Sequence, residues 1–165
     1  NSSIVRYAQL FSIDETNTVF CNRGTSGIDG STSTAIGAAY VNKNQTVFIT
    51  GDLSFFYDSN SLWNKNISKS FRIIIINNSG GGIFKIIPGP NSTNALKYFE
   101  TPHCLTAEPL CKMYGFEYQK GFSTETVKEQ LNGFYKTSDK PKILEIFTAS
   151  EKNDLILKEY FKYIQ

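Results

Sequence analysis

The stretch TVFITGDLSFFYDSNSLWNKNISKSFRIIIINNSGG, residues 46–81, decides the fold class. It opens on a short β-rich run at 46–50 and closes on a second run, FRIIII, at 71–76. Both runs are apolar enough for central strands that are covered on both faces. Because a helix-length segment separates them, we expect one strand–helix–strand unit of a parallel sheet.

Outside this unit, strands and helices continue to alternate along the chain. We expect further strands at 18–22 (TVFCN), 116–119 and 142–147 (KILEIF). Helical patterns lie at 4–11, 31–41, 106–114, 123–135 and 151–164. The sequence therefore predicts an α/β fold, a parallel sheet with helices on both faces, in one domain over residues 1–165.

The composition narrows the class of protein. No apolar run is long enough to span a bilayer, and a net charge of +2 from scattered basic residues gives no indication of nucleic-acid binding. Cys21, Cys104 and Cys111 lack C-x-x-C spacing, so we expect buried or half-buried free thiols in a reducing compartment rather than a zinc site. The single histidine, His103, lies in a loop broken by proline, and we expect it to be structural.

Polar residues and glycines follow both strands of the 46–81 unit. Gly51 and Asp52 follow the first strand, and Asn78 and Gly80 follow the second. Because ligands of parallel sheets bind beyond the carboxyl ends of the strands, these two loops should lie side by side at one edge. Carboxylate, amide and carbonyl oxygens are the ligands that magnesium prefers, and glycines let the backbone approach a diphosphate. The loops therefore indicate a magnesium–diphosphate site.

The Gly-Asp start and Asn-Asn end of this unit resemble the signature of the thiamine-diphosphate enzymes. The resemblance implies that Asp52 and Asn78 bind Mg²⁺ or Mn²⁺ through their side chains, and Gly80 through its carbonyl. The ion then anchors the diphosphate of the cofactor, thiamine diphosphate. The common third residue of the signature is Gly, and Leu53 replaces it here, which narrows the subfamily. The other cofactor-binding residues that the resemblance implies are Ile28, Gly51, Leu53, Ser54, Gly81 and Ile83.

The first loop, NRGTSGIDG at 22–30, resembles one branch of these enzymes. Together with GDLSFFYDSNSL and NNSGGGIF, it is similar to the 2-succinyl-5-enolpyruvyl-6-hydroxy-3-cyclohexene-1-carboxylate synthases of menaquinone biosynthesis. The resemblance covers nearly the whole chain but only the carboxy-terminal part of those synthases. It implies a transferase that decarboxylates 2-oxoglutarate and adds the succinyl unit to isochorismate.

The resemblance also implies which residues bind the substrates. Since both substrates carry carboxylates, we expect Arg23 and Arg6 to bind them, with Ser2 as a hydroxyl partner. Ile83 and Phe84 match apolar residues that line the substrate and cofactor site. Ile28 matches the residue that supports the bent cofactor.

The catalytic glutamate of this superfamily lies in a separate pyrimidine-binding domain, usually on a partner subunit. We therefore expect no catalytic residue within 1–165, and interpret the chain as the inactive carboxy-terminal part of a longer cytoplasmic protein. Its expected partners are the other domains and a second subunit, in a homodimer or homotetramer. The segment Phe55-Phe56-Tyr57 is a candidate contact with them, or else a helix face within this domain.

Three alternatives remain open. Another 2-oxoacid decarboxylase or an acetolactate-type synthase would usually carry different residues in the first loop. A nucleotide-binding Rossmann-like module would need a G-x-G-x-x-G turn after the first strand, which this sequence lacks. In a non-catalytic flavodoxin-like scaffold, the Gly/Pro-rich stretch 79–93 would be only a mobile loop.

Overall fold

The computed structural model describes residues 4–5, 8, 10–22, 24–25 and 27–164, and Ser2, Arg6 and Arg23 lie outside these ranges. Within them, a four-stranded parallel sheet has the strand order β1-β2-β4-β3. The strands are β1 (Val47–Gly51), β2 (Arg72–Asn77), β3 (Glu117–Gly121) and β4 (Lys142–Phe147).

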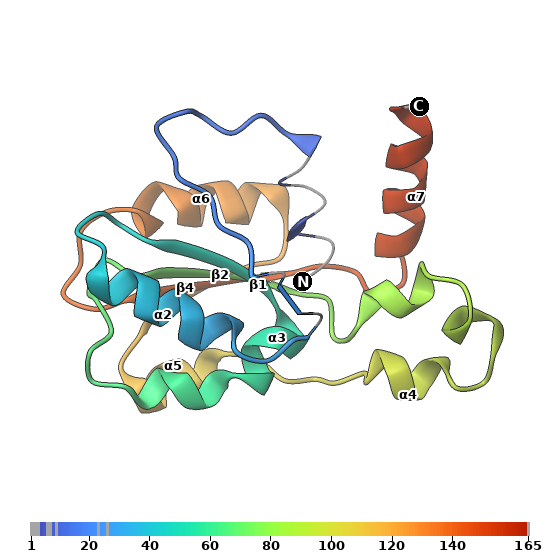
Figure 1. Cartoon of the computed structure of the whole chain (residues 1–165), viewed down its shortest axis with the longest axis horizontal. Coiled ribbons are helices and arrows are strands. Elements are labelled where there is room, and N and C mark those ends of the chain that lie inside the picture. The colour runs from blue at the N-terminus through green and yellow to red at the C-terminus, as the bar shows by residue number, and fades with distance from the viewer. Residues whose placement is uncertain (1–3, 6–7, 9, 23, 26, 165) are drawn as a thin grey trace.

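Helices cover both faces of the sheet, as the sequence predicted (Figure 1). The α-helices are α2 (Ser31–Val41), α3 (Asp52–Tyr57), α4 (Leu96–Glu100), α5 (Glu108–Tyr114), α6 (Thr124–Phe134) and α7 (Asn153–Tyr163). The 3-10 turns are η1 (Ser59–Trp63), η2 (Gly82–Lys85) and η3 (Pro90–Ser92). α2, α3 and α5 lie on one face of the sheet, and α6 lies on the other. Three elements, η2, α4 and α7, extend beyond the carboxyl ends of the strands.

The isoleucine run of β2 forms the centre of the core because successive side chains of a strand point to opposite faces. Ile73 and Ile75 pack into the larger cluster, with residues of α2, α3 and α5. Ile74 packs on the opposite face against Leu144 and against Phe134 of α6. Burial on both faces confirms that β2 is a central strand.

Two expectations for the strands were wrong. β1 is an edge of the described sheet, and its Val47 and Ile49 are 40% and 47% exposed, because α6 packs against β3 and β4 and does not cover β1. The segment 18–22 forms no strand, and its Phe20 is 88% exposed. β-propensity reflects packing against neighbouring strands, and no described strand pairs with this segment.

The aromatic segment Phe55-Phe56-Tyr57, at the end of α3, is mostly internal. Phe55 is fully buried, and Phe56 packs against the same cluster, so neither is an exposed contact for another domain. Tyr57 alone of the three points outward, at 71% exposure. None of the described helices has the length and apolar character of a membrane-spanning segment.

Candidate functional site at the carboxyl edge of the sheet

Asp52 and Gly80 are in direct contact where β1 and β2 end. Gly51 pairs with Ile76, so the two strands reach the edge of the sheet at the same level. The Gly80 backbone N–H donates to Asp52 Oδ2 over 2.9 Å, and the Leu53 N–H donates to Asp52 Oδ1 over 2.8 Å. The Asp52 side chain is only 1% exposed. The loops after the two strands therefore lie side by side around one buried carboxylate.

The two consecutive asparagines after β2 have different surroundings. Asn77 is buried, and its Nδ2 donates to Glu145 Oε1 over 2.7 Å and to the Leu105 carbonyl over 3.0 Å. Its Oδ1 accepts the Ser79 N–H over 2.9 Å. The half-buried Asn78 side chain forms no such bonds with the described residues. Asn77 therefore holds the loop in place, and the amide of Asn78 is available to a ligand.

The glycines of this loop fit tightly against their neighbours. A Cβ on Gly80 would lie 2.8 Å from the Glu100 carbonyl oxygen, and Gly80 has a φ of 153°. A Cβ on Gly82 would lie 2.8 Å from Asn78 Nδ2. The Gly81 N–H donates to the Glu100 carbonyl over 2.6 Å. Side chains at these positions would therefore crowd the loop after β2 where the Gly80 N–H meets Asp52.

Backbone strain gathers at the same place. Among the described residues, Ser79 and Thr101 are the two non-glycine residues with positive φ, at 61° and 48°. Ser79 precedes Gly80, and Thr101 follows Glu100, whose carbonyl accepts the Gly81 N–H. Such conformations cost about 1–3 kcal/mol each and cluster at functional sites.

His103 was expected to be structural, and the structure places its ring beside Asp52. Its Nε2 lies 3.2 Å from Asp52 Oδ2, and its side chain is 10% exposed. Its ring also packs edge-on against Phe56, with 5.5 Å between ring centroids. Sequence reasoning missed this position because nothing in the spacing of TPHC relates it to a residue 51 positions earlier.

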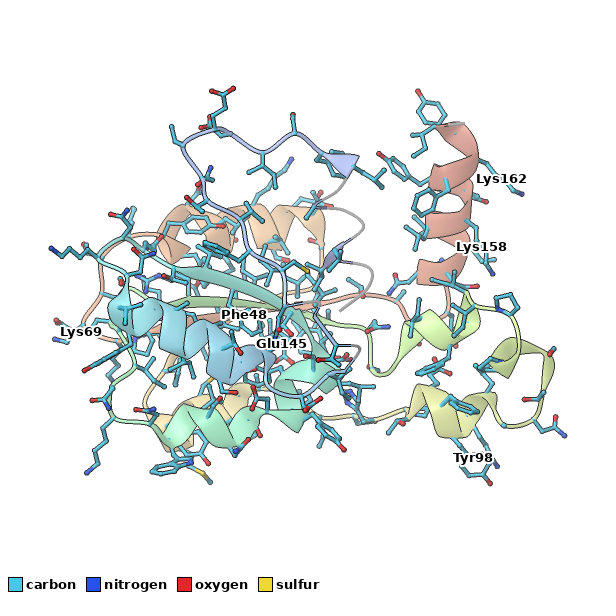
Figure 2. All side chains as sticks on the ribbon, in the orientation of Figure 1. Phe48, Lys69, Tyr98, Glu145, Lys158 and Lys162 are labelled. Carbon is cyan, nitrogen blue, oxygen red and sulfur yellow. The ribbon has the colours of Figure 1, made fainter. Side chains whose placement is uncertain are left out.

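Glu145 is a second residue that sequence reasoning missed. It is fully buried in the middle of β4 (Figure 2). Besides the bond from Asn77, its Oε2 accepts the Tyr118 hydroxyl over 2.6 Å and the Ala107 N–H over 3.0 Å. Burial and the bond to Glu145 raise the pKa of Tyr118. A charged residue inside the apolar run KILEIF was the available signal, because a buried carboxylate needs donors.

Reactivity of the cysteines tests how tightly the residues around Glu145 are packed. Burial, together with the charges of Glu145 and Glu108, raises the pKa of Cys111 to about 12. Because the thiolate is the reactive form, we expect a thiol reagent at about pH 8 to label Cys111 only after unfolding. Cys21 and Cys104 are exposed, contrary to the sequence expectation, and should react quickly in the folded chain. Mass spectrometry of labelled peptides distinguishes the three, and rapid native labelling of Cys111 would contradict this packing.

The remaining predicted cofactor residues border the loops. The hydroxyl of Ser54, in α3, donates to the Ile28 carbonyl over 2.8 Å, which ties the segment 27–30 to α3. The Ile28 side chain is 40% exposed. Ile83 and Phe84 are half-buried in η2, and the Phe84 ring packs against Phe99 of α4, with 5.4 Å between ring centroids. Of the predicted substrate-binding residues, Ile83 and Phe84 are therefore near the site, and Ser2, Arg6 and Arg23 lie outside the described residues.

The oxygen atoms of these two loops are of the chemical types that a divalent cation prefers. The Asp52 carboxylate is buried, and no described lysine or arginine forms an ion pair with it. A buried carboxylate without a cation is costly, and a bound ion would compensate its charge. The described residues contain no group of three His, Cys, Asp or Glu side chains suited to a metal. One carboxylate with amide and carbonyl oxygens suits magnesium, which completes its shell with water and phosphate oxygens.

Two cavities lie elsewhere on the described surface. One, of about 460 Å³, lies between α2 and η1 and includes Tyr40 and Trp63 in its lining. The other, of about 590 Å³, lies beside the start of α6 and includes Phe122 and Phe147. Asp52 lines neither cavity. The candidate site is therefore inferred from the hydrogen bonds between the two loops and not from either cavity.

Comparison with known proteins agrees with this geometry. The family described as "Thiamine pyrophosphate enzyme, C-terminal TPP binding domain" matches residues 2–146. The chain is 56% identical to the 2-succinyl-5-enolpyruvyl-6-hydroxy-3-cyclohexene-1-carboxylate synthase of Christiangramia forsetii, over 100% of this chain and 29% of that protein. It is 57% and 43% identical to the synthases of the same name from Flavobacterium johnsoniae and Porphyromonas gingivalis, over 98% and 99% of this chain and 29% of each relative.

The resemblance to these synthases that the three loops indicated is therefore confirmed, and the chain spans about 29% of the length of the three relatives. The match over residues 2–146 also confirms the α/β fold of a diphosphate-binding domain. The chain belongs to the family of C-terminal thiamine pyrophosphate-binding domains of thiamine pyrophosphate enzymes.

Proposed function

We propose that this chain is the magnesium- and diphosphate-binding domain of a synthase that decarboxylates 2-oxoglutarate and adds the succinyl unit to isochorismate. The observation that carries the proposal is the contact between the buried Asp52 carboxylate and the Gly80 backbone. It brings the loops after β1 and β2 together in a domain of the thiamine pyrophosphate-binding family.

In this proposal, three groups of the chain hold the metal ion, Mg²⁺ or Mn²⁺. Asp52 supplies the charge, and Asn78 supplies an amide oxygen that the described residues leave without a partner. Gly80 supplies its carbonyl, which accepts a 3.2 Å bond from the Gly82 N–H and keeps a second lone pair. When bound, thiamine diphosphate supplies the carbanion-stabilising chemistry that decarboxylation of a 2-oxoacid requires.

The other residues shape and position the site. Asn77 and Glu145 hold the loop that presents Asn78 and Gly80, and Leu53 orients the carboxylate through its N–H. Gly51 and Gly81 let the backbone pass close to the diphosphate, and Ser54 holds Ile28 beside α3 through its hydroxyl. Ile28, Ile83 and Phe84 are proposed to line the cofactor and substrate. Arg23, Arg6 and Ser2 stay predictions as the residues that bind the substrate carboxylates.

The substrates are proposed from the printed names of the relatives and from the resemblance of the first loop. The relatives at 56%, 57% and 43% identity carry the same synthase name, which supports a synthase of this kind. Menaquinone biosynthesis is the pathway that the resemblance of the loops implies. Because the chain spans about 29% of their length, we propose that the pyrimidine-binding domain and the activating glutamate lie elsewhere in the complete protein. A homodimer or homotetramer and a cytoplasmic location remain predictions.

The complete protein provides the test. Release of carbon dioxide from 2-oxoglutarate should require isochorismate, thiamine diphosphate and Mg²⁺ together, with Mn²⁺ as a substitute. Pyruvate in place of 2-oxoglutarate is the control for an acetolactate-type reaction. Turnover of pyruvate without turnover of 2-oxoglutarate would contradict the proposal, as would activity that does not depend on the cofactor.

A further inference from the structure

His103 carries a buried hydrogen-bond donor that faces the candidate site. Its Nδ1 accepts the backbone N–H of Leu105 over 3.1 Å. A ring nitrogen that accepts an N–H carries no proton, so in the neutral imidazole the proton is on Nε2. Nε2 is therefore a donor, and it has no lone pair with which to bind a metal ion.

This donor has no acceptor among the described residues. Nε2 lies 3.2 Å from Asp52 Oδ2 but outside hydrogen-bonding geometry, and Oδ2 already accepts the Gly80 N–H. The side chain of His103 is nine-tenths buried, so water reaches this nitrogen poorly. An unsatisfied buried donor costs about 1–3 kcal/mol, which an acceptor brought by a ligand would recover.

Three contacts hold the His103 ring with Nε2 toward Asp52. The His103 backbone N–H donates to the Ser79 carbonyl over 3.2 Å, which attaches residue 103 to the loop that contains Gly80. Phe56 packs edge-on against the ring, and the Leu105 N–H holds the opposite nitrogen. The donor is therefore held in place before any ligand binds.

We propose that His103 Nε2–H donates a hydrogen bond to an oxygen of the bound diphosphate, as a cofactor-binding residue separate from the metal ligands. The inference rests on the proposed function and deepens it. A diphosphate held next to Asp52 by a metal ion would bring anionic oxygens to the place that the donor faces. A bond from a neutral donor to such an oxygen is charge-assisted, and therefore stronger than a bond between neutral groups.

Two matched substitutions separate the donor from the packing role. His103→Asn retains an acceptor near Nδ1 for the Leu105 N–H but removes the donor at Nε2. His103→Gln retains a donor at the distance of Nε2. Calorimetry on the complete protein with saturating Mg²⁺ would measure the affinity for thiamine diphosphate and for inorganic pyrophosphate. A separate titration would measure the affinity for Mg²⁺ alone.

His103→Asn should weaken binding of both diphosphates about tenfold, or about 1.4 kcal/mol, whereas His103→Gln should stay within about threefold of the unchanged protein. The affinity for Mg²⁺ alone should not change in either variant. Thermal unfolding checks that both variants fold. If His103→Asn does not fold, His103→Phe keeps the ring against Phe56, lacks both nitrogens, and should show the same tenfold loss.

Unchanged diphosphate affinity in a folded variant without the donor would overturn the inference and leave the proposed function intact. A loss confined to Mg²⁺ binding would also overturn it, because His103 would then act through Asp52 or a metal-bound water. If the unchanged protein binds no thiamine diphosphate in the presence of Mg²⁺, both the proposed function and this inference fail.

Discussion

Replacing Asp52 with asparagine should weaken magnesium-dependent binding of thiamine diphosphate in the complete protein by about 100-fold or more, or about 2.7 kcal/mol. Both carboxylate oxygens accept backbone N–H groups, from Leu53 and Gly80. The amide of asparagine would point an NH₂ group at one of these donors, and it brings no charge to a divalent ion. Calorimetry with and without Mg²⁺ measures the effect.

Asp58→Asn is the matched control for this substitution. Asp58 is also buried, and it accepts bonds of 2.7 to 3.0 Å from the backbone and hydroxyl of Ser33, at the start of α2. This variant should lose thermal stability but keep its affinity for the cofactor within about twofold, or about 0.4 kcal/mol, because the Asp58 carboxylate bonds to Ser33 and not to the loops after β1 and β2. Magnesium-dependent binding that survives Asp52→Asn would remove Asp52 from the metal site.

Gly80→Ala should reduce both the stability of the protein and its affinity for thiamine diphosphate. The new Cβ would lie 2.8 Å from the Glu100 carbonyl oxygen, a backbone atom that cannot rotate away, and φ at this position is 153°. The strain should cost about 1–3 kcal/mol of unfolding free energy. Because relief of the clash moves the Gly80 carbonyl relative to Asp52, cofactor affinity should fall about tenfold or more.

Gly115→Ala separates backbone strain from damage to the site. Gly115 follows α5 with a φ of 79°, and a Cβ there would meet open space. Thermal or denaturant unfolding should show a loss of about 1–2 kcal/mol, the cost of the left-handed conformation for a residue with a side chain. Calorimetry should show unchanged cofactor affinity. An equal loss of affinity in both variants would mean that Gly80 acts only through stability.

The patterns that predicted most of the fold were those that a strand or helix imposes by itself. The isoleucine run predicted β2, and the apolar run KILEIF predicted β4. The polar residues after β1 and β2 indicated that the loops after these two strands lie side by side. The periodicity of apolar residues reports only on the segment that carries it. It therefore could not predict that α6 packs against β3 and β4 and leaves β1 uncovered. For the same reason the β-rich pattern predicts a strand at 18–22, whereas the structure shows an exposed segment without strand pairing.

The contacts that complete the site come from long separations in the sequence. His103 reaches Asp52 across 51 positions, and Glu145 reaches Asn77 across 68. Neither distance follows from a repeat or a motif, because both depend on how the segment after α4 and the strand β4 pack against the loop after β2. The sequence therefore indicated the residues of the proposed diphosphate site, whereas the structure identified the residues that hold the two loops in place.

The central claim is that a metal ion binds between the loops after β1 and β2 and anchors the diphosphate. A crystal structure of the complete protein with thiamine diphosphate and Mn²⁺ would test it most directly, because anomalous scattering locates manganese without reference to the coordinates. We expect one manganese peak within bonding distance of the Asp52 carboxylate, the Asn78 amide oxygen and the Gly80 carbonyl. A cofactor bound with the ion elsewhere, or with none of these three groups in contact with it, would contradict the claim.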